Sequence, residues 1–240
     1  MRFGDLTKKT LIHSMKYLLI LGFYFSTCQL MAQSSGQELL DKVVNQFNKV
    51  NDYSANVVVK ADVPMIKALP VKAKIYYKKK DKFKVVSKSI AILPKQGFTD
   101  VNVFLSDKSN YMVVEAGEKL IANVQTKLLT VIANESSSEI ILAKLWVDPV
   151  NNIIIASEVT TRSSGTVKVN YKYGAQINYG LPSQIKFIVD VKEFKMPKSF
   201  SSNPHKVGSS KKSNRKTGVI LLDISNYVVN QGIADSFFKN

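Results

Sequence analysis

Cysteine and histidine are nearly absent from this sequence of 240 residues. The single cysteine, Cys28, and one of the two histidines, His13, lie within the first 32 residues, and the other histidine is His205. Zinc sites and Ser-His-Asp triads require these residue types, so neither is expected. The patterns GxGxxG, GxxxxGK(S/T) and GxSxG are missing as well, which removes the common nucleotide-binding and hydrolase signatures. We therefore expect no metal, no cofactor, no catalytic residue and no enzyme activity.

Paired carboxylates are the remaining route to acid–base catalysis. No spacing in the sequence places two of them together, and we interpret them as scattered surface residues. The acids considered are Asp62, Asp81, Asp100, Asp107, Glu115 and Glu118.

Arginine is also scarce, although the chain is strongly basic. Its 34 basic residues outnumber 18 acidic ones, for a net charge of +16, yet only Arg2, Arg162 and Arg215 are arginines. Arginine is the side chain that binds phosphate with two parallel hydrogen bonds, so its scarcity argues against a nucleic-acid partner. A lysine-rich surface that faces water or an anionic membrane is the preferred interpretation.

No apolar run is long enough to span a bilayer. The longest one near the N-terminus, YLLILGFYF, follows Lys16 and precedes the polar stretch STCQLMAQ, which is the order of a secretory signal. We predict a cleavable signal peptide over 1–32, with the true start at Met1 or at Met15, and export to the periplasm. A lipid anchor on Cys28 is not favoured, because Thr27 fits the residue before a lipidated cysteine poorly.

An amphipathic helix is predicted to begin at Ser35, which lies three residues before Glu38 in the spacing of a capping box. Apolar residues then recur at intervals of three and four, with polar residues between them. The pattern fits a helix packed on its own core and equally a movable cover over a pocket.

From Tyr53 onward the apolar period changes to two, with β-branched and aromatic residues opposite lysines. We predict strands at 53–62, 71–78, 82–93, 101–105, 110–115, 139–147, 152–161, 166–173, 184–193 and 218–229, and leave 118–132 open between strand and short helix. Short turns between consecutive strands favour an antiparallel meander that curls on itself. Residues 195–216 are basic and serine-rich, and we predict a flexible loop that is either a hydrated linker or a contact to anionic headgroups.

The start of the exported chain resembles the LolA/LolB lipoprotein-carrier superfamily, which also includes RseB-like sensors. The resemblance depends on the N-terminal helix, on YSA at 53–55 and on the hairpin KAKIYYKKKDKFKV at 72–85. Within the family pattern G-x-(L/I)-x-(V/Y/F)-K-R-P-x-x-(F/L), Ile75, Tyr77 and Phe83 fall in register, as does Lys78. LWVDPVNN at 145–152 and GIADSFFK at 232–239, with Phe237 or Phe238 inward, resemble later parts of the same family.

The resemblance implies an α+β fold for a single domain over 33–240: a strongly curved antiparallel sheet, or unclosed β-barrel, covered by the N-terminal amphipathic helix. It also implies a monomer that holds the acyl chains of lipids or lipoproteins and carries them to the outer membrane without covalent chemistry. The alternative is an RseB-like envelope sensor that acts through a protein partner. In the family an arginine governs acyl-chain binding and release, and Lys79 stands at its position here, followed by Lys80 in place of proline.

From the alternation of the strands and the apolar face of the helix we predict a lipid-binding lining, although each of these residues could equally be part of an ordinary core. The predicted lining is Leu40, Val44, Phe47, Val57, Val59, Ile75, Tyr77, Phe83, Val85, Val169 and Tyr171. Lys78, Lys79 and Lys80 are predicted to contact an anionic headgroup or a partner, the alternative being solvated hairpin lysines.

Overall fold

The computed structural model describes residues 35–63, 66–67, 69–80, 82–87, 104–163, 165–190 and 217–239. They contain a helix over 35–47, a helical turn at 104–106 and three short 3-10 helices, η1 (Lys108–Asn110), η2 (Ile177–Tyr179) and η4 (Asp235–Phe238). The strands are β1 (Asp52–Val63), β2 (Ile66–Lys67), β3 (Val71–Lys78), β4 (Lys82–Ser87), β5 (Tyr111–Ile121), β6 (Val124–Ala133), β7 (Ile140–Asp148), β8 (Ile153–Thr161), β9 (Gly165–Tyr173), β10 (Pro182–Asp190) and β11 (Thr217–Val229).

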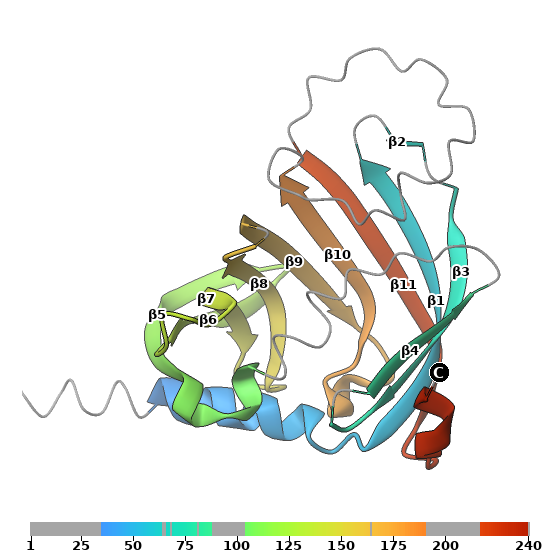
Figure 1. Ribbon diagram of the computed structural model, residues 1–240. Helices are drawn as coiled ribbons and strands as arrows, with labels where there is room; N and C mark the ends of the chain where they lie inside the picture. The colour runs from blue at the N-terminus through green and yellow to red at the C-terminus, as the bar shows by residue number, and fades with distance from the viewer. Residues whose placement is uncertain are drawn as a thin grey trace, which may run out of the picture.

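All eleven strands belong to one sheet, with neighbours in the order β4-β3-β1-β11-β10-β9-β8-β7-β6-β5 and β2 paired to β1. Every described pairing is antiparallel, and the long-range pairing of β1 with β11 joins the two ends of the chain. The sheet bends strongly, and in the described part of the chain β4 and β5 remain as its two edges (Figure 1). The predicted fold class, an unclosed curved antiparallel sheet with an N-terminal helix, is confirmed.

Alternation along each strand separates a buried face from a wet face. On β1, Ala55, Val57 and Val59 are buried, while Asn56 and Lys60 are exposed. Burying one apolar face and hydrating the other is what period-two patterning produces in an antiparallel sheet.

The N-terminal helix crosses one end of the curved sheet (Figure 1). Its start lies against β5, where Ser35 donates a hydrogen bond to Glu115 at 2.9 Å. Gly36 permits this close approach, because a Cβ there would lie 3.3 Å from the backbone nitrogen of Glu115. The helix ends with tighter turns, in which Lys49 N donates to Gln46 O and Val50 N donates to Phe47 O.

The buried apolar residues form two clusters. One, which contains Phe187 and Leu222, joins β1, β3, β9, β10 and β11. The other, which contains Leu129 and Leu40, joins β5, β6, β7 and β8 to the first half of the helix. Phe47, at the far end of the helix, packs against the first cluster instead, so the one helix bridges both.

One predicted strand is wrong, and one open segment is resolved. Residues 104–106 are helical, whereas a strand was predicted at 101–105, because Phe104 and Leu105 are buried together against the second cluster rather than alternating. The segment 118–132, which the sequence left undecided between strand and short helix, belongs to the hairpin of β5 and β6. Its turn residues Ala122 and Asn123 both have positive φ, as a tight two-residue turn requires. The predictions for 1–32, 88–93 and 195–216 fall outside the described residues.

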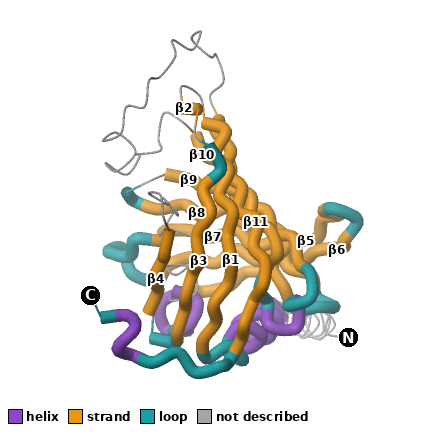
Figure 2. Tube along the Cα trace, turned by 90° about the vertical axis from the view of Figure 1, so that its right-hand side faces the viewer, coloured by secondary structure: helices purple, strands orange, loops and turns teal. Residues whose placement is uncertain are grey.

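The C-terminal prediction also needs correction. Phe237 or Phe238 was predicted to point inward, and neither joins a buried cluster. The Phe237 ring packs on Tyr76 at 4.5 Å between centroids, on the outer face of β3, and the Phe238 ring packs on Phe237 at 5.6 Å. The segment 235–238 is a 3-10 helix, and it lies beside the β3–β4 hairpin (Figure 2).

The first cluster gives a direct stability test. Replacing the nearly inaccessible Phe187 by alanine should lower the free energy of unfolding by about 3–5 kcal/mol, because apolar contacts are lost and a void remains. Chemical denaturation measures this loss, and Lys186→Ala, on the exposed face one residue away, should change it by less than about 0.5 kcal/mol. Equal effects of the two substitutions would contradict the described burial.

Candidate functional site

A cavity of about 110 Å³ lies between the two clusters, beneath the helix. Its walls are mainly aliphatic and aromatic, and the few polar groups come from loops and helix ends. The lining residues are Val43, Val44, Phe47, Asn48, Tyr53, Tyr77, Phe83, Leu105, Ser106, Asn152, Ile153, Ile154, Tyr171, Tyr173, Gly180, Leu181, Pro182, Ile185 and Tyr227. The cavity can therefore hold an apolar group, and in its present size only part of a long chain.

Strand register decides which inward residues reach the cavity. Tyr53 lies opposite Tyr77, which lies opposite Phe83, and all three line the cavity. The next inward row, which contains Ile75 and Val85, lies deeper in the first cluster and does not reach the cavity. A residue must therefore point inward to line the cavity, but its position along the strand decides whether it reaches the cavity.

Five of the eleven residues predicted as lining are brought together around the cavity: Val44, Phe47, Tyr77, Phe83 and Tyr171. The other six do not line it. Leu40 is buried in the second cluster, and Val57, Val59, Ile75, Val85 and Val169 belong to the first or pack against it. Contact of any of these residues with lipid stays a prediction.

Five tyrosines line the cavity and form what we call the tyrosine wall: Tyr53, Tyr77, Tyr171, Tyr173 and Tyr227. The sequence predicted only Tyr77 and Tyr171 of these, and it predicted none of the loop residues in the lining. Tyr53 was detectable, because it continues the inward alternation of β1. Tyr227 was not, because a bulge at Asn226 shifts the alternation of β11 by one residue after the inward Ile220, Leu222 and Ile224. Leu105, Asn152 and Leu181 gave no comparable signal, since each lies in or beside a loop whose position depends on distant pairing.

Aromatic rings form one connected side of the cavity. The Tyr53 ring stacks on Tyr77 at 5.3 Å between centroids and meets Tyr227 at 5.5 Å, and Phe47 from the helix meets Tyr77 at 5.5 Å. Such offset and tilted contacts stabilise aromatic pairs beyond their burial alone. The helix is therefore held on the aromatic wall by the Phe47 ring.

The tyrosine hydroxyls remain uncharged. Burial raises the pKa of Tyr53, Tyr171, Tyr173 and Tyr227 above the ordinary value for tyrosine. Tyr173 donates to the carbonyl of Ile154 at 2.8 Å. The cavity thus presents neutral dipoles rather than charges at physiological pH.

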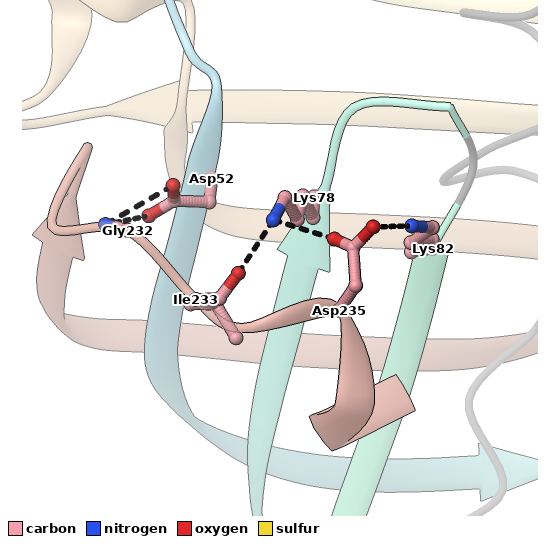
Figure 3. A network of polar contacts seen from close by, with 6 residues as sticks. All are labelled: Asp52, Lys78, Lys82, Gly232, Ile233 and Asp235. Carbon is pink, nitrogen blue, oxygen red and sulfur yellow. Dashed lines mark hydrogen bonds and ion pairs between the residues drawn. The ribbon is translucent and has the colours of Figure 1, made fainter. Parts of the chain in front are cut away.

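The three hairpin lysines occupy different positions. Lys78 donates to Ile233 O at 2.6 Å and pairs with Asp235 at 2.6 Å, and Lys82 pairs with the same carboxylate at 2.6 Å (Figure 3). Lys79 donates to Asn48 O at 2.7 Å, just beyond the helix. Lys80 is exposed in the turn with φ of 67°. Lys78 and Lys79 therefore bind the protein itself, and headgroup or partner contact by any of the three stays a prediction.

Asp52 fixes the start of the C-terminal segment. Its carboxylate accepts hydrogen bonds from Gln231 N at 3.1 Å. It also accepts from Gly232 N at 3.1 and 3.2 Å (Figure 3). The polar contacts of the segment therefore reach from β1 to β4 across the outer side of the hairpin.

The described residues contain no group of three or more His, Cys, Asp or Glu side chains arranged to hold a metal ion. Among the helices of the described ranges, none has the length and apolar character needed to cross a membrane.

The sequence matches no family model and no curated protein. Solved structures are similar in three dimensions. A LolA superfamily protein from Nitrosomonas europaea has a TM-score of 0.55 at 14% identity, over 85% of this chain and 97% of that one. A domain described as an outer membrane lipoprotein-sorting protein from Vibrio parahaemolyticus has a TM-score of 0.55 at 11% identity, over 86% of this chain and 97% of that one. A DUF1329 family protein from Desulfovibrio piger has a TM-score of 0.54 at 12% identity, over 87% of this chain and 97% of that one.

These likenesses show that the chain has the LolA-like fold, as its hairpin pattern predicted. Because identity is 14% or lower, they carry the fold alone. MucB also matches, with a TM-score of 0.30, which is too low to support the sensor alternative.

The C-terminal ion pairs should depend on pH. Lys78 and Lys82 lower the pKa of Asp235 from 3.8 to about 2, so the pairs contribute fully above pH 3.8 and are lost as pH falls towards 2. Asp235→Asn should speed amide hydrogen exchange in 233–239 and β4 severalfold at pH 6, and the difference from wild type should vanish near pH 2. NMR measures both rates. Asp107→Asn, at another exposed carboxylate of lowered pKa, should leave this region unchanged. An equal effect would contradict the role of the Asp235 ion pairs in holding residues 233–239 on the hairpin.

Proposed function

We propose that this protein is a periplasmic carrier that binds acyl chains of lipids or lipoproteins without covalent chemistry. The observation that carries the proposal is the apolar cavity left between two core clusters and covered by a single helix. The domain from Vibrio parahaemolyticus with the same fold is described as an outer membrane lipoprotein-sorting protein, which agrees with carriage towards the outer membrane. The periplasmic location rests on the signal-like segment at 1–32.

A cavity lined by aliphatic side chains and neutral tyrosines suits the energetics of carrying an acyl chain. Burying a methylene gains about 0.8 kcal/mol, so a chain of about 16 carbons represents roughly 12 kcal/mol whether a protein or a bilayer buries it. A carrier must match the bilayer closely and still release the chain. Aliphatic side chains and neutral tyrosines meet that need, because they remove hydrocarbon from water without a strong specific bond.

A complete chain needs more room than the cavity offers, and the helix is the element that can provide it. Three exposed polar contacts hold its far end and the residues just beyond it: Gln46 donates to Asn151 O at 3.2 Å, Lys79 to Asn48 O at 2.7 Å, and Asn230 to Lys49 O at 2.9 Å. All six residues are wholly or partly exposed, so water can replace these bonds at small cost. We infer that the helix moves aside when a chain enters.

Filling the cavity should weaken lipid binding. Val44→Trp places a large ring on the cavity side of the helix and should lower the lipid bound to protein isolated from the periplasm about tenfold, equivalent to about 1.4 kcal/mol. Native mass spectrometry followed by lipid extraction measures the bound fraction. Asn45→Trp, on the exposed side of the same turn, is the matched control and should retain wild-type lipid.

Absence of lipid from the wild-type protein, while a known carrier handled alongside retains its own, would refute the proposed function. Equal lipid content in the two tryptophan variants would show that lipid binds elsewhere.

Weakening the Lys79 contact should speed release. A cation next to the carbonyl end of a helix contributes about 0.3–1 kcal/mol, so Lys79→Gln should raise the rate of acyl-chain transfer to acceptor vesicles about twofold to fivefold. Transfer of a fluorescent acyl lipid measures the rate. Lys72→Gln, exposed on the same hairpin, should leave it unchanged, and an equal acceleration would indicate general charge effects instead.

A further inference from the structure

One hydroxyl of the tyrosine wall has no partner within the described part of the chain. Tyr53 lines the cavity and is only 5% exposed, yet its hydroxyl makes no hydrogen bond to any described residue. Among the side-chain nitrogen and oxygen atoms of the described residues that are not exposed, only Oδ1 of Asn152 is both unpaired and inaccessible. The unpaired Tyr53 hydroxyl therefore retains accessible surface. Buried polar groups are nearly always paired, so this one points to a partner that comes from outside the chain.

The Tyr53 ring is held in place, which gives its hydroxyl a defined position. β1 is paired with β3 on one side and with β11 on the other. Tyr77 and Tyr227 from these two strands pack against the Tyr53 ring at 5.3 and 5.5 Å between centroids. The side chain is thus enclosed from both sides, and its accessible part lies at the cavity that it lines. A hydroxyl fixed in this way binds a ligand atom without first having to be ordered.

Two other hydroxyls of the tyrosine wall are already used as donors. Tyr173 donates to Ile154 O and Tyr227 donates to Pro182 O, both at 2.8 Å. Either one would have to give up a bond within the protein in order to donate to a ligand. Tyr53 can donate without that loss.

The surroundings of Tyr53 determine which acceptor fits. Burial raises the pKa of Tyr53, so the hydroxyl keeps its hydrogen and remains a donor at physiological pH. None of the described lining residues is charged, so a carboxylate or a phosphate would be buried there without a counter-charge, at a large cost. A carbonyl oxygen accepts a hydrogen bond and brings no charge. The acceptor that fits is therefore the carbonyl oxygen of an ester or an amide.

We propose that the Tyr53 hydroxyl is a polar subsite that donates a hydrogen bond to the carbonyl oxygen of an ester-linked or amide-linked acyl chain. This proposal rests on the proposed function and adds the substrate class, which is neutral acyl derivatives rather than free fatty acids. The bond replaces one that the carbonyl makes to water, so its net contribution is small and the chain can still be released.

Two variants and two pairs of probes test the subsite. Tyr53→Phe removes the hydroxyl and keeps the ring, and Tyr173→Phe does the same to a lining hydroxyl that is already bonded. The ester pair is dodecanoyl lysophosphatidylcholine against its dodecyl ether analogue, and the amide pair is N-dodecanoyl-N-methylglucamine against dodecyl glucoside. Only the first member of each pair has a carbonyl. Affinity is measured by displacement of N-phenylnaphthylamine, and comparing the affinity ratio between variants cancels the different hydration of the probes.

The ratio of carbonyl to non-carbonyl affinity should fall about fivefold to tenfold in Tyr53→Phe, equal to about 1–1.4 kcal/mol, and should not change in Tyr173→Phe. A fall in the ester pair alone identifies ester-linked chains, and a fall in the amide pair alone identifies amide-linked ones. If the probes bind and neither ratio changes, or both variants change equally, the subsite is refuted while the carrier function stands. If dodecanoate loses as much affinity as the acyl probes, the restriction to neutral carbonyls is refuted. If no probe binds wild type, both proposals fail.

Stability gives an independent check that the Tyr53 hydroxyl is unpaired. Tyr53→Phe breaks no hydrogen bond, so the denaturant concentration at the midpoint of unfolding should not fall. Tyr173→Phe loses the bond to Ile154 O and should unfold at a lower denaturant concentration. An equal fall in both variants would show that the Tyr53 hydroxyl has a partner within the protein, and would overturn the proposal.

Discussion

The structure depends on a mismatch between one long curved sheet and one short helix. The sheet presents more inward apolar surface than the helix over 35–47 can cover, so the buried residues separate into two clusters. Leu40 belongs to the cluster at one end of the helix and Phe47 packs on the cluster at the other. A close-packed interior would have joined them. The cavity lies where the two clusters face each other without meeting, lined by Tyr53, Leu181 and Ile185 of the first and by Leu105 of the second.

Leaving the sheet open exposes two edge strands, and each carries a feature that hinders pairing with another chain. β4 is short, and its Lys84 donates to Phe237 O at 2.8 Å and lies over the Phe237 ring. β5 is interrupted by a register shift between Glu115 and Glu118, where Gly117 adopts φ of 108°. The C-terminal segment and the bulge therefore let the sheet stay unclosed without offering a long flat edge.

The sequence was sufficient to predict which way side chains point, and insufficient to predict how deep they lie. Alternation placed Val57, Tyr77 and Tyr171 on the inward face correctly, because the period of a strand is fixed by its backbone. Whether an inward residue meets the cavity or another side chain depends on cross-strand register. That register brings Tyr171 opposite Ile185 at the cavity, and Val169 opposite Phe187 in the core, one row further.

The same limit explains the missed loop residues and the missed interruption of β5. A bulge breaks the alternation on which strand prediction relies, and the contacts of 104–106 come from distant parts of the chain. The family pattern located the hairpin but not the partners of its lysines. Asp235, which holds Lys78, is more than 150 residues away in sequence, beyond the reach of any local pattern.

The two sides of the cavity differ in how firmly they are fixed, and this difference indicates that the helix, rather than the tyrosine side, moves when a chain enters. The tyrosine wall is fastened by hydrogen bonds from Tyr173 to Ile154 O and from Tyr227 to Pro182 O, and these donors lie on strands paired on both sides. The far end of the helix is fastened by the Phe47 ring and by exposed polar contacts. Opening the tyrosine side would break ladder hydrogen bonds of the sheet, whereas lifting the helix end would uncover Phe47, Val43 and Val44 and break no ladder bond. An entering acyl chain can cover these apolar side chains again, so chain entry through the helix side costs the least.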